Sequence, residues 1–221
     1  TSTKELNLIN IYNKTIIKIM SFRTENKFIF SKNKIFLFKQ WLVKNDYSEL
    51  YPKRSVNSVY LDTKNFMIYK DSLEGTIPRK KIRLRTYSNN FVNKNNKFNY
   101  EIKISSAEGR YKKQAKYNEK IDKIFKGVYD SQYGMCYPVL NIVYDREYYL
   151  KNKSRITIDT NIKYYNINGK RISKYPCNEE YYVVENKTKD LSQNEMLDFF
   201  IFDNKRFSKY CNAVERIQKN I

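Results

Sequence analysis

The stretch Lys81-Ile82-Arg83-Leu84-Arg85-Thr86-Tyr87 alternates charged and apolar side chains along the chain. Successive side chains of a β-strand point to opposite faces, so this pattern puts the three cations on one face and the two aliphatic residues on the other. A single strand of this kind is typical of an antiparallel edge strand with its charges in water. The interpretation changes because the same alternation recurs near Arg23, Glu101, Tyr144, Arg155 and Glu185.

The rest of the sequence predicts several further strands and few helices. Helical spacing of apolar residues predicts one helix from the cap Ser31 to about Asn45 and another that begins at Asp190 or Ser192. Three segments stay ambiguous: 66–69 fits a short helix or a hairpin arm, 110–117 fits a strand or a loop, and 118–125 has helical character. Expected strands are 21–30, 56–61, 80–87, 98–105, 138–149, 155–159, 162–167 and 181–187, with a polar turn at 89–97 and a hairpin turn at Asn168-Gly169.

A chain of 221 residues with 21 Tyr and 13 Phe can bury the core of one large domain. We expect a single domain over residues 21–221, preceded by a lead-in segment, 1–20, that is poorly ordered or forms a short helix. No apolar run approaches the ~18 residues that a transmembrane helix requires, and the first residues lack the apolar core of a signal peptide. Three widely spaced Cys without a CxxC pair favour a reducing, cytoplasmic location over a disulfide framework.

The charge balance and the absence of histidine narrow the chemistry. The net charge of +20, from 43 Lys and Arg against 23 Asp and Glu, predicts an anionic partner. Nucleic acid, an acidic membrane surface and a phosphorylated molecule all fit this prediction. Because the sequence has no His, Ser-His-Asp catalysis, Cys-His catalysis and His-ligated zinc are excluded.

The alternating strands predict an enclosed charged space. Helices that pack on the apolar faces leave the charged faces to line the inside of the sheet when it closes into a barrel. We therefore expect an α+β fold, mainly antiparallel β, with a closed barrel, a charged lumen and flanking helices. The lumen would contain the cations Lys27, Lys81, Arg83, Arg85, Lys103, Arg146, Arg155 and Lys187, opposed by Glu25, Glu101, Asp159 and Glu185.

Four carboxylates cannot neutralise so many cations, and each unpaired buried charge costs several kcal/mol. A wet lumen that receives a highly charged anion removes this cost. A linear triphosphate or a polyphosphate fits, because phosphate oxygens accept charge-assisted hydrogen bonds from several Arg and Lys at once. The surplus carboxylates then suit a hard divalent cation that is carried with the phosphates.

The charged motifs resemble a known family. The strand Arg23-x-Glu25-x-Lys27 resembles the opening ExExK-type motif of the triphosphate tunnel metalloenzymes (the CYTH-like superfamily), in a variant with Arg first. With this strand, and in this order, the motifs that follow look like the VTC domain, the polyphosphate polymerase branch of that superfamily, over roughly residues 21–215. They are Val59-Tyr60-Leu61-Asp62-Thr63, Lys81-x-Arg83-x-Arg85-x-Tyr87, Glu101-x-Lys103, Val143-x-x-Arg146, Arg155-x-x-x-Asp159, Val184-Glu185-x-Lys187 and Phe207-Ser208-Lys209-Tyr210.

The resemblance implies an eight-stranded antiparallel tunnel and an activity. Such a tunnel binds a nucleoside triphosphate, with ATP expected here, together with Mn²⁺ or Mg²⁺, and transfers the γ-phosphoryl group to a growing polyphosphate chain. By motif, the candidate catalytic residues are Arg83, Arg85, Lys103, Arg146 and Arg155. The candidate phosphate-binding residues are Lys27, Lys81, Lys187, Lys209 and either Lys112 or Lys113, of which Lys113 is taken as the candidate. The candidate metal ligands are Glu185, Glu25 and Glu101.

The sequence departs from the family pattern at two positions, and two alternative functions also fit it. Asn186 replaces a usual apolar residue, which predicts a polar group on the outer side of its strand, and Ala213 replaces a common Gly in a presumed tail turn. A triphosphatase would use the same tunnel with water as the attacking group. A nucleic-acid binder would explain the net charge and the interleaved aromatics, but not the in-phase Glu25, Glu101 and Glu185, so no specific nucleic-acid partner is expected.

Overall fold

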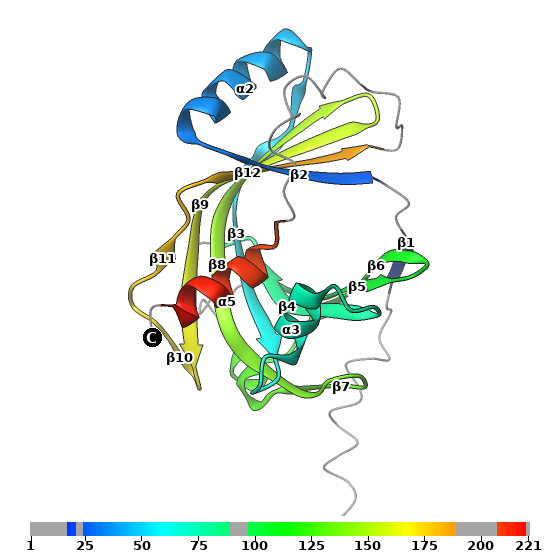
Figure 1. Cartoon of the computed structure of the whole chain (residues 1–221), viewed down its shortest axis with the longest axis vertical. Helices are drawn as coiled ribbons and strands as arrows, with labels where there is room; N and C mark the ends of the chain where they lie inside the picture. The colour runs from blue at the N-terminus through cyan, green and yellow to red at the C-terminus, as the bar shows by residue number, and fades with distance from the viewer. Residues whose placement is uncertain (1–16, 21–23, 89–96, 189–206, 220–221) are drawn as a thin grey trace, which may run out of the picture.

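The computed structural model describes residues 17–20, 24–88, 97–188 and 207–219, and it is built around one large antiparallel sheet (Figure 1). The principal strands follow the order β1-β6-β5-β4-β3-β8-β9-β12-β2, and β7, β10 and β11 add to β8 and β9. The strands are β1 Ile17–Met20, β2 Thr24–Phe30, β3 Ser48–Asp62, β4 Arg79–Thr86, β5 Phe98–Ser106, β6 Gly109–Tyr117, β7 Val128–Asp130, β8 Gly134–Lys151, β9 Ser154–Asn168, β10 Arg171–Ile172, β11 Cys177–Asn178 and β12 Tyr182–Thr188. The helices are α2 Lys32–Lys44, α3 Met67–Glu74, the 3-10 helix η1 Ile121–Lys126 and α5 Lys209–Gln218.

The sheet curves but does not close by hydrogen bonding within the described residues. Its two edge strands are β1 and β2, and no pairing joins them in this part of the chain. β1 nevertheless ends at Met20 and β2 begins at Thr24, so the chain ties the two edges within ~14 Å at this point. The expected mainly antiparallel α+β fold is therefore confirmed, whereas strand pairing within the described residues does not show the expected closure into a barrel.

Most expected elements are present, and β3, β8 and β9 are longer than the sequence predicted. The helix after Ser31 is confirmed, because the Ser31 side chain accepts a hydrogen bond from the Lys34 amide at 3.3 Å and the helix ends at the cap Asn45. Segment 110–117 is a strand, and 66–69 opens helix α3, which ends at the left-handed Gly75. The turn at 89–97 falls almost wholly outside the described residues, and the expected helix after Asp190 lies outside them entirely.

Two expectations about the ends of the chain are wrong. Residues 17–20 form strand β1, which pairs with β6, rather than a poorly ordered lead-in or a helix. The tail beyond the Ser-Lys-Tyr motif is helix α5, which starts because the Ser208 side chain accepts a hydrogen bond from the Cys211 amide at 3.3 Å. Ala213 is therefore a fully buried helical residue and not part of a turn.

Helix α2 covers the outer face of β2, β9 and β12 (Figure 1). Phe30 and Phe38 are fully buried there and their rings meet edge to face at 5.3 Å. These apolar side chains alternate along β2, β9 and β12 with the charged ones, which must therefore point to the other face of the sheet. The cluster contains Phe28, Phe30, Ile35, Phe38, Leu42, Tyr47, Ile156, Ile158 and Val184.

Asn186 lies on this outer face, as its place in the strand predicts. It is buried, and its Oδ1 accepts a hydrogen bond from the Ser154 hydroxyl at 3.1 Å. Ser154 in turn accepts one from the Tyr47 hydroxyl at 3.2 Å. A small polar network thus replaces apolar packing beside α2, and the inner face is unchanged.

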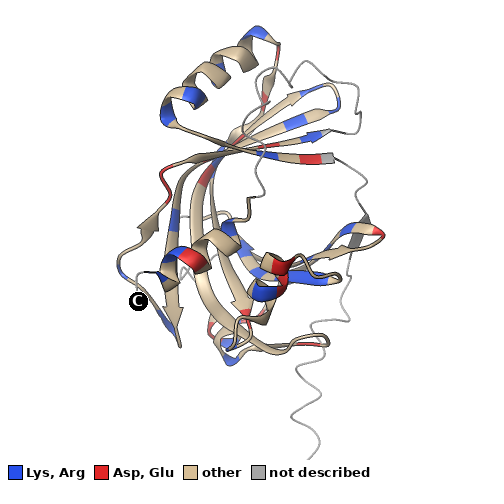
Figure 2. Ribbon diagram, viewed as in Figure 1, with Lys and Arg blue, Asp and Glu red and all other residues tan. Residues whose placement is uncertain are grey.

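Strand register places the charged residues of neighbouring strands side by side on the inner face. Directly paired positions on antiparallel strands share a face. The charged pairs are Lys81 with Lys103, Arg83 with Glu101, Arg146 with Asp159, Glu185 with Lys27, Lys187 with Glu25 and Arg155 with Lys187. Figure 2 shows Lys and Arg segments along the strands with Asp and Glu segments among them.

We expect Phe38→Ala to lower the free energy of unfolding by about 3–5 kcal/mol, because it leaves a cavity under α2. Phe36→Ala on the same helix is the matched control, since Phe36 is 62% exposed and its removal should change stability by less than about 0.5 kcal/mol. Urea unfolding followed by circular dichroism measures both. Equal losses for the two variants would contradict the assignment of the buried face.

Candidate functional site

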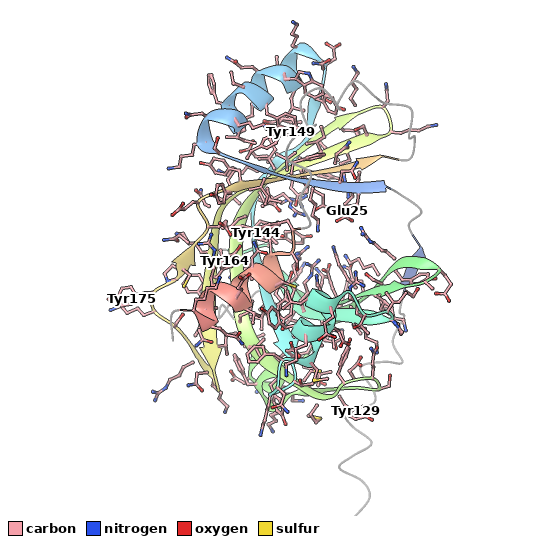
Figure 3. All side chains as sticks on the ribbon, in the orientation of Figure 1. Glu25, Tyr129, Tyr144, Tyr149, Tyr164 and Tyr175 are labelled. Carbon is pink, nitrogen blue, oxygen red and sulfur yellow. The ribbon has the colours of Figure 1, made fainter. Side chains whose placement is uncertain are left out.

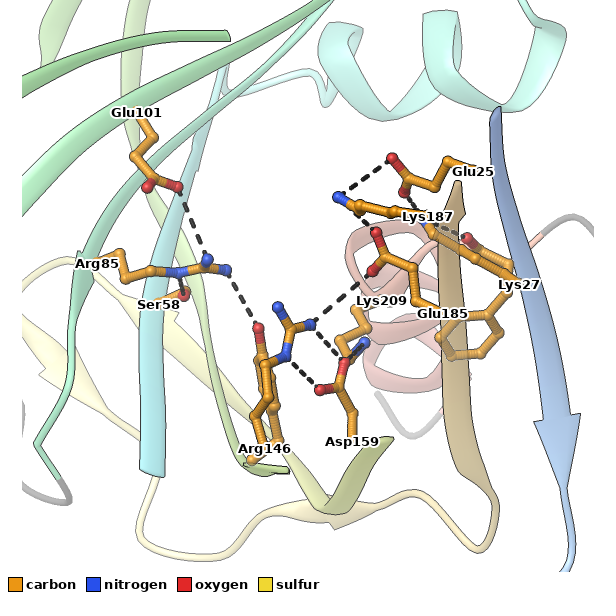
Figure 4. Close-up of polar contacts among 12 residues, drawn as sticks. Glu25, Lys27, Ser58, Arg85, Glu101, Arg146, Asp159, Glu185, Lys187 and Lys209 are labelled. Atoms are coloured by element: carbon orange, nitrogen blue, oxygen red, sulfur yellow. Dashed lines mark hydrogen bonds and ion pairs between the residues drawn. The ribbon is translucent and has the colours of Figure 1, made fainter. Parts of the chain in front are cut away.

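The inner face of the sheet carries a continuous group of charged side chains, called here the lumen site (Figure 4). Its members come from β2, β4, β5, β6, β8, β9, β12 and the start of α5. The cations are Lys27, Lys81, Arg83, Arg85, Lys103, Lys112, Arg146, Arg155, Lys187 and Lys209, and the carboxylates are Glu25, Glu101, Asp159 and Glu185.

Glu101 on β5 organises one side of the lumen site. Its Oε2 lies 2.7 Å from Arg83 Nε and 3.8 Å from Arg85 Nη1, and its Oε1 lies 2.6 Å from Lys112 Nζ. Burial opposes ionisation of Glu101, but the fields of Arg83, Arg85 and Lys112 outweigh it and hold the pKa of Glu101 well below its usual range. Glu101 is thus a fixed anion that orders three cations.

Tyrosine and serine hydroxyls also position Arg83 and Arg85. Arg83 Nη1 donates to the Tyr60 hydroxyl at 3.0 Å. Arg85 donates from Nε to Ser58 at 3.0 Å and from Nη2 to the Tyr144 hydroxyl at 3.1 Å. A guanidinium has five N–H donors, so each arginine keeps donors that these contacts do not use.

Asp159 on β9 organises the facing side. Arg146 binds it in a bidentate manner, with Nε at 2.5 Å from Oδ1 and Nη2 at 2.7 Å from Oδ2, and Lys209 Nζ lies 2.5 Å from Oδ2. Burial opposes ionisation of Asp159, but Arg146 and Lys209 hold its pKa below the usual value. Lys209 belongs to the first turn of α5, so this ion pair also anchors that helix to the sheet.

Glu185 and Glu25 share Lys187 on strands β12 and β2. Lys187 Nζ lies 2.7 Å from Glu185 Oε1 and 3.4 Å from Glu25 Oε2, and Lys27 Nζ lies 3.4 Å from Glu25 Oε1. Arg146 Nη2 is 4.0 Å from Glu185 Oε2. Burial opposes ionisation of Glu185, but Lys187, Lys27 and Arg146 hold its pKa well below the usual value.

Lys103 lies between the two sides. Burial lowers the pKa of Lys103 well below its usual value, and the field of Arg83 acts in the same direction. Glu185 and Glu25, which belong to the opposite side, partly offset this effect. Figure 4 shows Glu101, from the same strand as Lys103, on one side of the lumen site and Glu25 and Glu185 on the other.

The start of α5 meets the inner face at one end of the lumen site. Lys81 Nζ donates to the Ser208 hydroxyl at 2.8 Å. Tyr210 stacks on Tyr60 with ring centroids 5.1 Å apart and donates a hydrogen bond to the buried Asp62. Lys27 Nζ also donates to the Phe207 carbonyl at 3.4 Å. The Phe-Ser-Lys-Tyr motif therefore lies against strands that are far from it in sequence.

Arg155 shares this face but makes no ion pair within the described residues. Its register partner on β12 is Lys187, another cation. Its Nε is buried and has no hydrogen-bond partner in this part of the chain. Arg155 is thus a cation whose charge no described carboxylate neutralises.

Lys113 lies away from the lumen site. It pairs with Ile102 on β5, whereas Lys112 pairs with Lys103 and so shares the charged face. The sequence spacing left Lys112 or Lys113 open, and the candidate Lys113 is corrected to Lys112 because strand parity puts Lys113 on the opposite face.

The sequence indicated no role for Ser58, and it favoured wall packing over a substrate-facing role for Tyr60 and Tyr144. Ser58, Tyr60 and Tyr144 hold the arginines, and Ser208 accepts from Lys81. The alternating positions of Ser58 and Tyr60 in the predicted strand 56–61 were the available signal. Arg54, the register partner of Arg146, was also missed, because β3 begins at Ser48, well before the predicted start.

The carboxylates fit a divalent cation only in one part of the site. Within the described residues, no group of three or more His, Cys, Asp or Glu side chains could hold a metal. Glu185 and Glu25 both lie within 3.4 Å of one ammonium, whereas Glu101 is paired on the other side (Figure 4). Mg²⁺ is usually held by one or two carboxylates together with substrate phosphates, so the pair Glu185 and Glu25 fits a metal that arrives with a phosphate chain.

The fold is a curved antiparallel sheet, and the described part of its inner face carries more cations than carboxylates. The sequence matches the family described as VTC domain over residues 22–135 and 116–218. Together these matches span most of the chain, and the protein belongs to the VTC domain family. No curated protein matches the sequence.

Solved structures share the fold at low sequence identity. A "putative adenylate cyclase" from Bacillus halodurans has a TM-score of 0.58 and 13% identity, over 90% of this chain and 97% of that chain. A protein of the same description from Vibrio parahaemolyticus has a TM-score of 0.51 and 11% identity, over 89% of this chain and 99% of that chain. This likeness concerns the fold alone. Among the described helices, none is long and apolar enough to cross a membrane.

We expect Asp159→Asn to destabilise the protein by about 3 kcal/mol at pH 7, because it leaves Arg146 and Lys209 without their shared anion. The pKa of Asp159 is lower in the folded state than the ~3.9 of an unfolded chain. The stabilisation is therefore present above pH ~4 and is lost as the pH falls through the folded-state pKa. Urea unfolding from pH 7 to pH 2.5 should show the two proteins converging at acid pH, and a constant difference would contradict the assignment.

Proposed function

We propose that this protein is a polyphosphate polymerase, which transfers the γ-phosphoryl group of a nucleoside triphosphate, with ATP as the natural substrate, to the end of a growing polyphosphate chain. The observation that carries the proposal is the surplus of positive charge in the lumen site, where ten of the described cations meet four carboxylates. Family membership and the shared fold support a triphosphate-handling enzyme.

A linear anion explains why the surplus is spread along several strands. Arg83 and Arg85 on β4, Arg146 on β8 and Arg155 on β9 can each bind a different phosphate of one chain. Phosphate oxygens accept bidentate hydrogen bonds from guanidinium groups. The carboxylates and hydroxyls that already hold three of these arginines fix their orientation before the substrate binds, which reduces the entropy lost on binding.

Phosphoryl transfer needs in-line alignment and stabilisation of spread negative charge more than covalent help. The arginines and Lys103 would face the equatorial oxygens of the transferring group, where charge must be stabilised. The acceptor is an ionised phosphate end, so no general base is required, and a chain without histidine is sufficient. Burial and the field of Arg83 lower the pKa of Lys103, and the negative charge of a bound phosphate would act against that shift.

The divalent cation expected from the fold is assigned to Glu185 and Glu25. When bound there, Mn²⁺ or Mg²⁺ supplies positive charge to phosphate oxygens. Lys187 lies between the two carboxylates and can move to a phosphate oxygen, which leaves both carboxylates available. Glu101 keeps its role as the anion that orders Arg83, Arg85 and Lys112.

The direct test is incubation of the purified protein with ATP and Mn²⁺, followed by gel analysis of phosphate chains and assay of orthophosphate. Long chains support the polymerase. Orthophosphate without chains would assign a triphosphatase in the same site instead. Neither product, together with tight metal-independent RNA binding, would reject an enzyme of this class.

Neighbouring lysines on β6 provide a matched pair of variants. We expect Lys112→Met to weaken tripolyphosphate binding by about 10- to 100-fold, because it removes a cation from the inner face and loosens Glu101. Lys113→Met changes the same charge on the opposite face and should alter the dissociation constant by less than about 2-fold. Isothermal titration calorimetry measures both. Similar losses would show that general charge, rather than the lumen site, binds the anion.

Removal of a carboxylate separates metal use from anion binding. Glu185→Gln should lower metal-dependent turnover by at least about 100-fold while metal-free tripolyphosphate binds as tightly as before or more tightly, since a negative charge is gone. Glu215→Gln is the control, because Glu215 lies exposed on α5 and pairs with Lys219. Parallel loss of anion binding and turnover in Glu185→Gln would reject the assignment of Glu185 to the metal.

A further inference from the structure

Arg54 extends the inner face beyond the lumen site. It pairs directly with Arg146 in the register of β3 and β8, so the two arginines share a face. Further along β3, Tyr60 contacts Tyr210 of α5. Arg146 therefore lies between Arg54 on β3 and Asp159 on β9, the carboxylate that holds Lys209 of α5.

Three tyrosines surround the Arg54 guanidinium. Its Cζ lies 4.8 Å from the ring centroid of Tyr51, 5.2 Å from that of Tyr87 and 4.7 Å from that of Tyr148. Tyr51 and Tyr148 meet edge to face at 5.5 Å. Tyr148 is buried, but Tyr51 and Tyr87 are 48% and 49% exposed. Arg54, Tyr51, Tyr87 and Tyr148 are called the tyrosine mouth.

The tyrosine mouth adjoins the phosphate-binding arginines. Tyr148 follows Arg146 on β8 with the same parity, and Tyr87 follows Arg85 along the chain with the same parity. Burial raises the pKa of Tyr148, and the fields of Arg146 and Arg54 act against that rise. Because Arg54 contacts the Tyr148 ring and is the register partner of Arg146, a ligand at the mouth can continue into the lumen site.

Arg54 has no carboxylate partner within the described residues, and its buried Nε makes no hydrogen bond there. Cation–π contacts stabilise it by about 0.5–2 kcal/mol each, but they do not neutralise its charge. Its register partner Arg146 repels it. The position therefore suits an anion, and the two half-exposed rings beside it suit a flat aromatic group.

We propose that the tyrosine mouth binds the nucleoside end of the substrate: the base stacks on the exposed ring of Tyr51 or Tyr87, and Arg54 contacts the phosphate nearest the ribose. This inference rests on the proposed function and adds an orientation to it. The terminal phosphate would then point toward Lys209 and the start of α5. Stacking offers nothing to an inorganic phosphate chain, so the mouth distinguishes a nucleotide from a polymer.

Stacking on a ring also predicts tolerance of base identity. Every base has a π-face, and stacking contributes about 1–3 kcal/mol per base. We expect ATP and GTP to bind more tightly than CTP and UTP, because purines cover more ring area.

The test compares ATP with inorganic tripolyphosphate by calorimetry, since both carry a triphosphate but only one carries a base. Tyr51→Leu combined with Tyr87→Leu should weaken ATP binding by about 5- to 100-fold and tripolyphosphate binding by less than 2-fold. Tyr87→Phe keeps the ring and should bind ATP like the wild type. Tyr175→Leu is the matched control, because Tyr175 is 78% exposed, has Lys174 5.5 Å from its ring, and lies at the periphery away from Tyr144 (Figure 3).

The outcomes separate the two proposals. Unchanged ATP affinity in the double variant, or an equal loss for ATP and tripolyphosphate, would overturn the tyrosine mouth and leave the polymerase proposal standing. A wild-type protein that binds neither ligand would reject the proposed function, and the mouth with it. Thermal melting of the double variant shows whether a loss reflects unfolding, and Tyr87→Phe then decides, since a loss of ATP binding in that variant would also overturn the stacking role.

Discussion

The constraint on which this structure depends is the repulsion among cations that share the inner face of one sheet. Like charges directly opposite on paired strands destabilise a sheet, yet Lys81 faces Lys103, Arg54 faces Arg146 and Arg155 faces Lys187. A few buried carboxylates offset this repulsion, because most of them form ion pairs with more than one cation. Glu101 orders three cations, Asp159 orders two, and the pair Glu185 and Glu25 shares Lys187. Removing a shared carboxylate would thus release more than one cation.

These shared anions also connect elements that are distant in sequence. Asp159 on β9 holds Lys209, so the position of α5 depends on the same carboxylate that orients Arg146. On the outer face, α2 is held mainly by apolar packing around Phe38, with the ion pair between Lys39 and Glu147 and the small network of Tyr47, Ser154 and Asn186 beside it. The two faces of the sheet are therefore stabilised by different interactions, ion pairs on the inner face and mainly apolar packing on the outer face. Packing on the outer face supplies stability, and the inner face can keep a surplus of charge because the outer face offsets its cost.

Strand parity explains how much of the site could be predicted from the sequence. Arg83, Glu101, Arg146 and Glu185 were placed on one face because a period of two is visible in the sequence and register preserves it. The sequence could not decide between Lys112 and Lys113, because a shift of one residue in the pairing of a strand exchanges its two faces. The register of β5 and β6 decides it. Arg54 was missed because β3 begins before the apolar part of its sequence. Helix α5 was missed because Ser208, which caps it, also accepts a hydrogen bond from the distant Lys81. The open edge between β1 and β2 depends on pairing, which no local pattern encodes.

The positive charge of this chain serves two different physical purposes. Screening is strong beyond ~8 Å at physiological ionic strength, so exposed lysines raise the rate of encounter with an anion more than the affinity for it. The cations of the lumen site are partly or fully removed from water, and their orientation is fixed by carboxylates and hydroxyls. Affinity for the proposed substrate would therefore depend on the geometry of a few side chains rather than on the net charge of +20. A nucleic acid would be held mainly by exposed lysines. A linear phosphate chain that enters the curved sheet would instead contact the oriented cations of the lumen site.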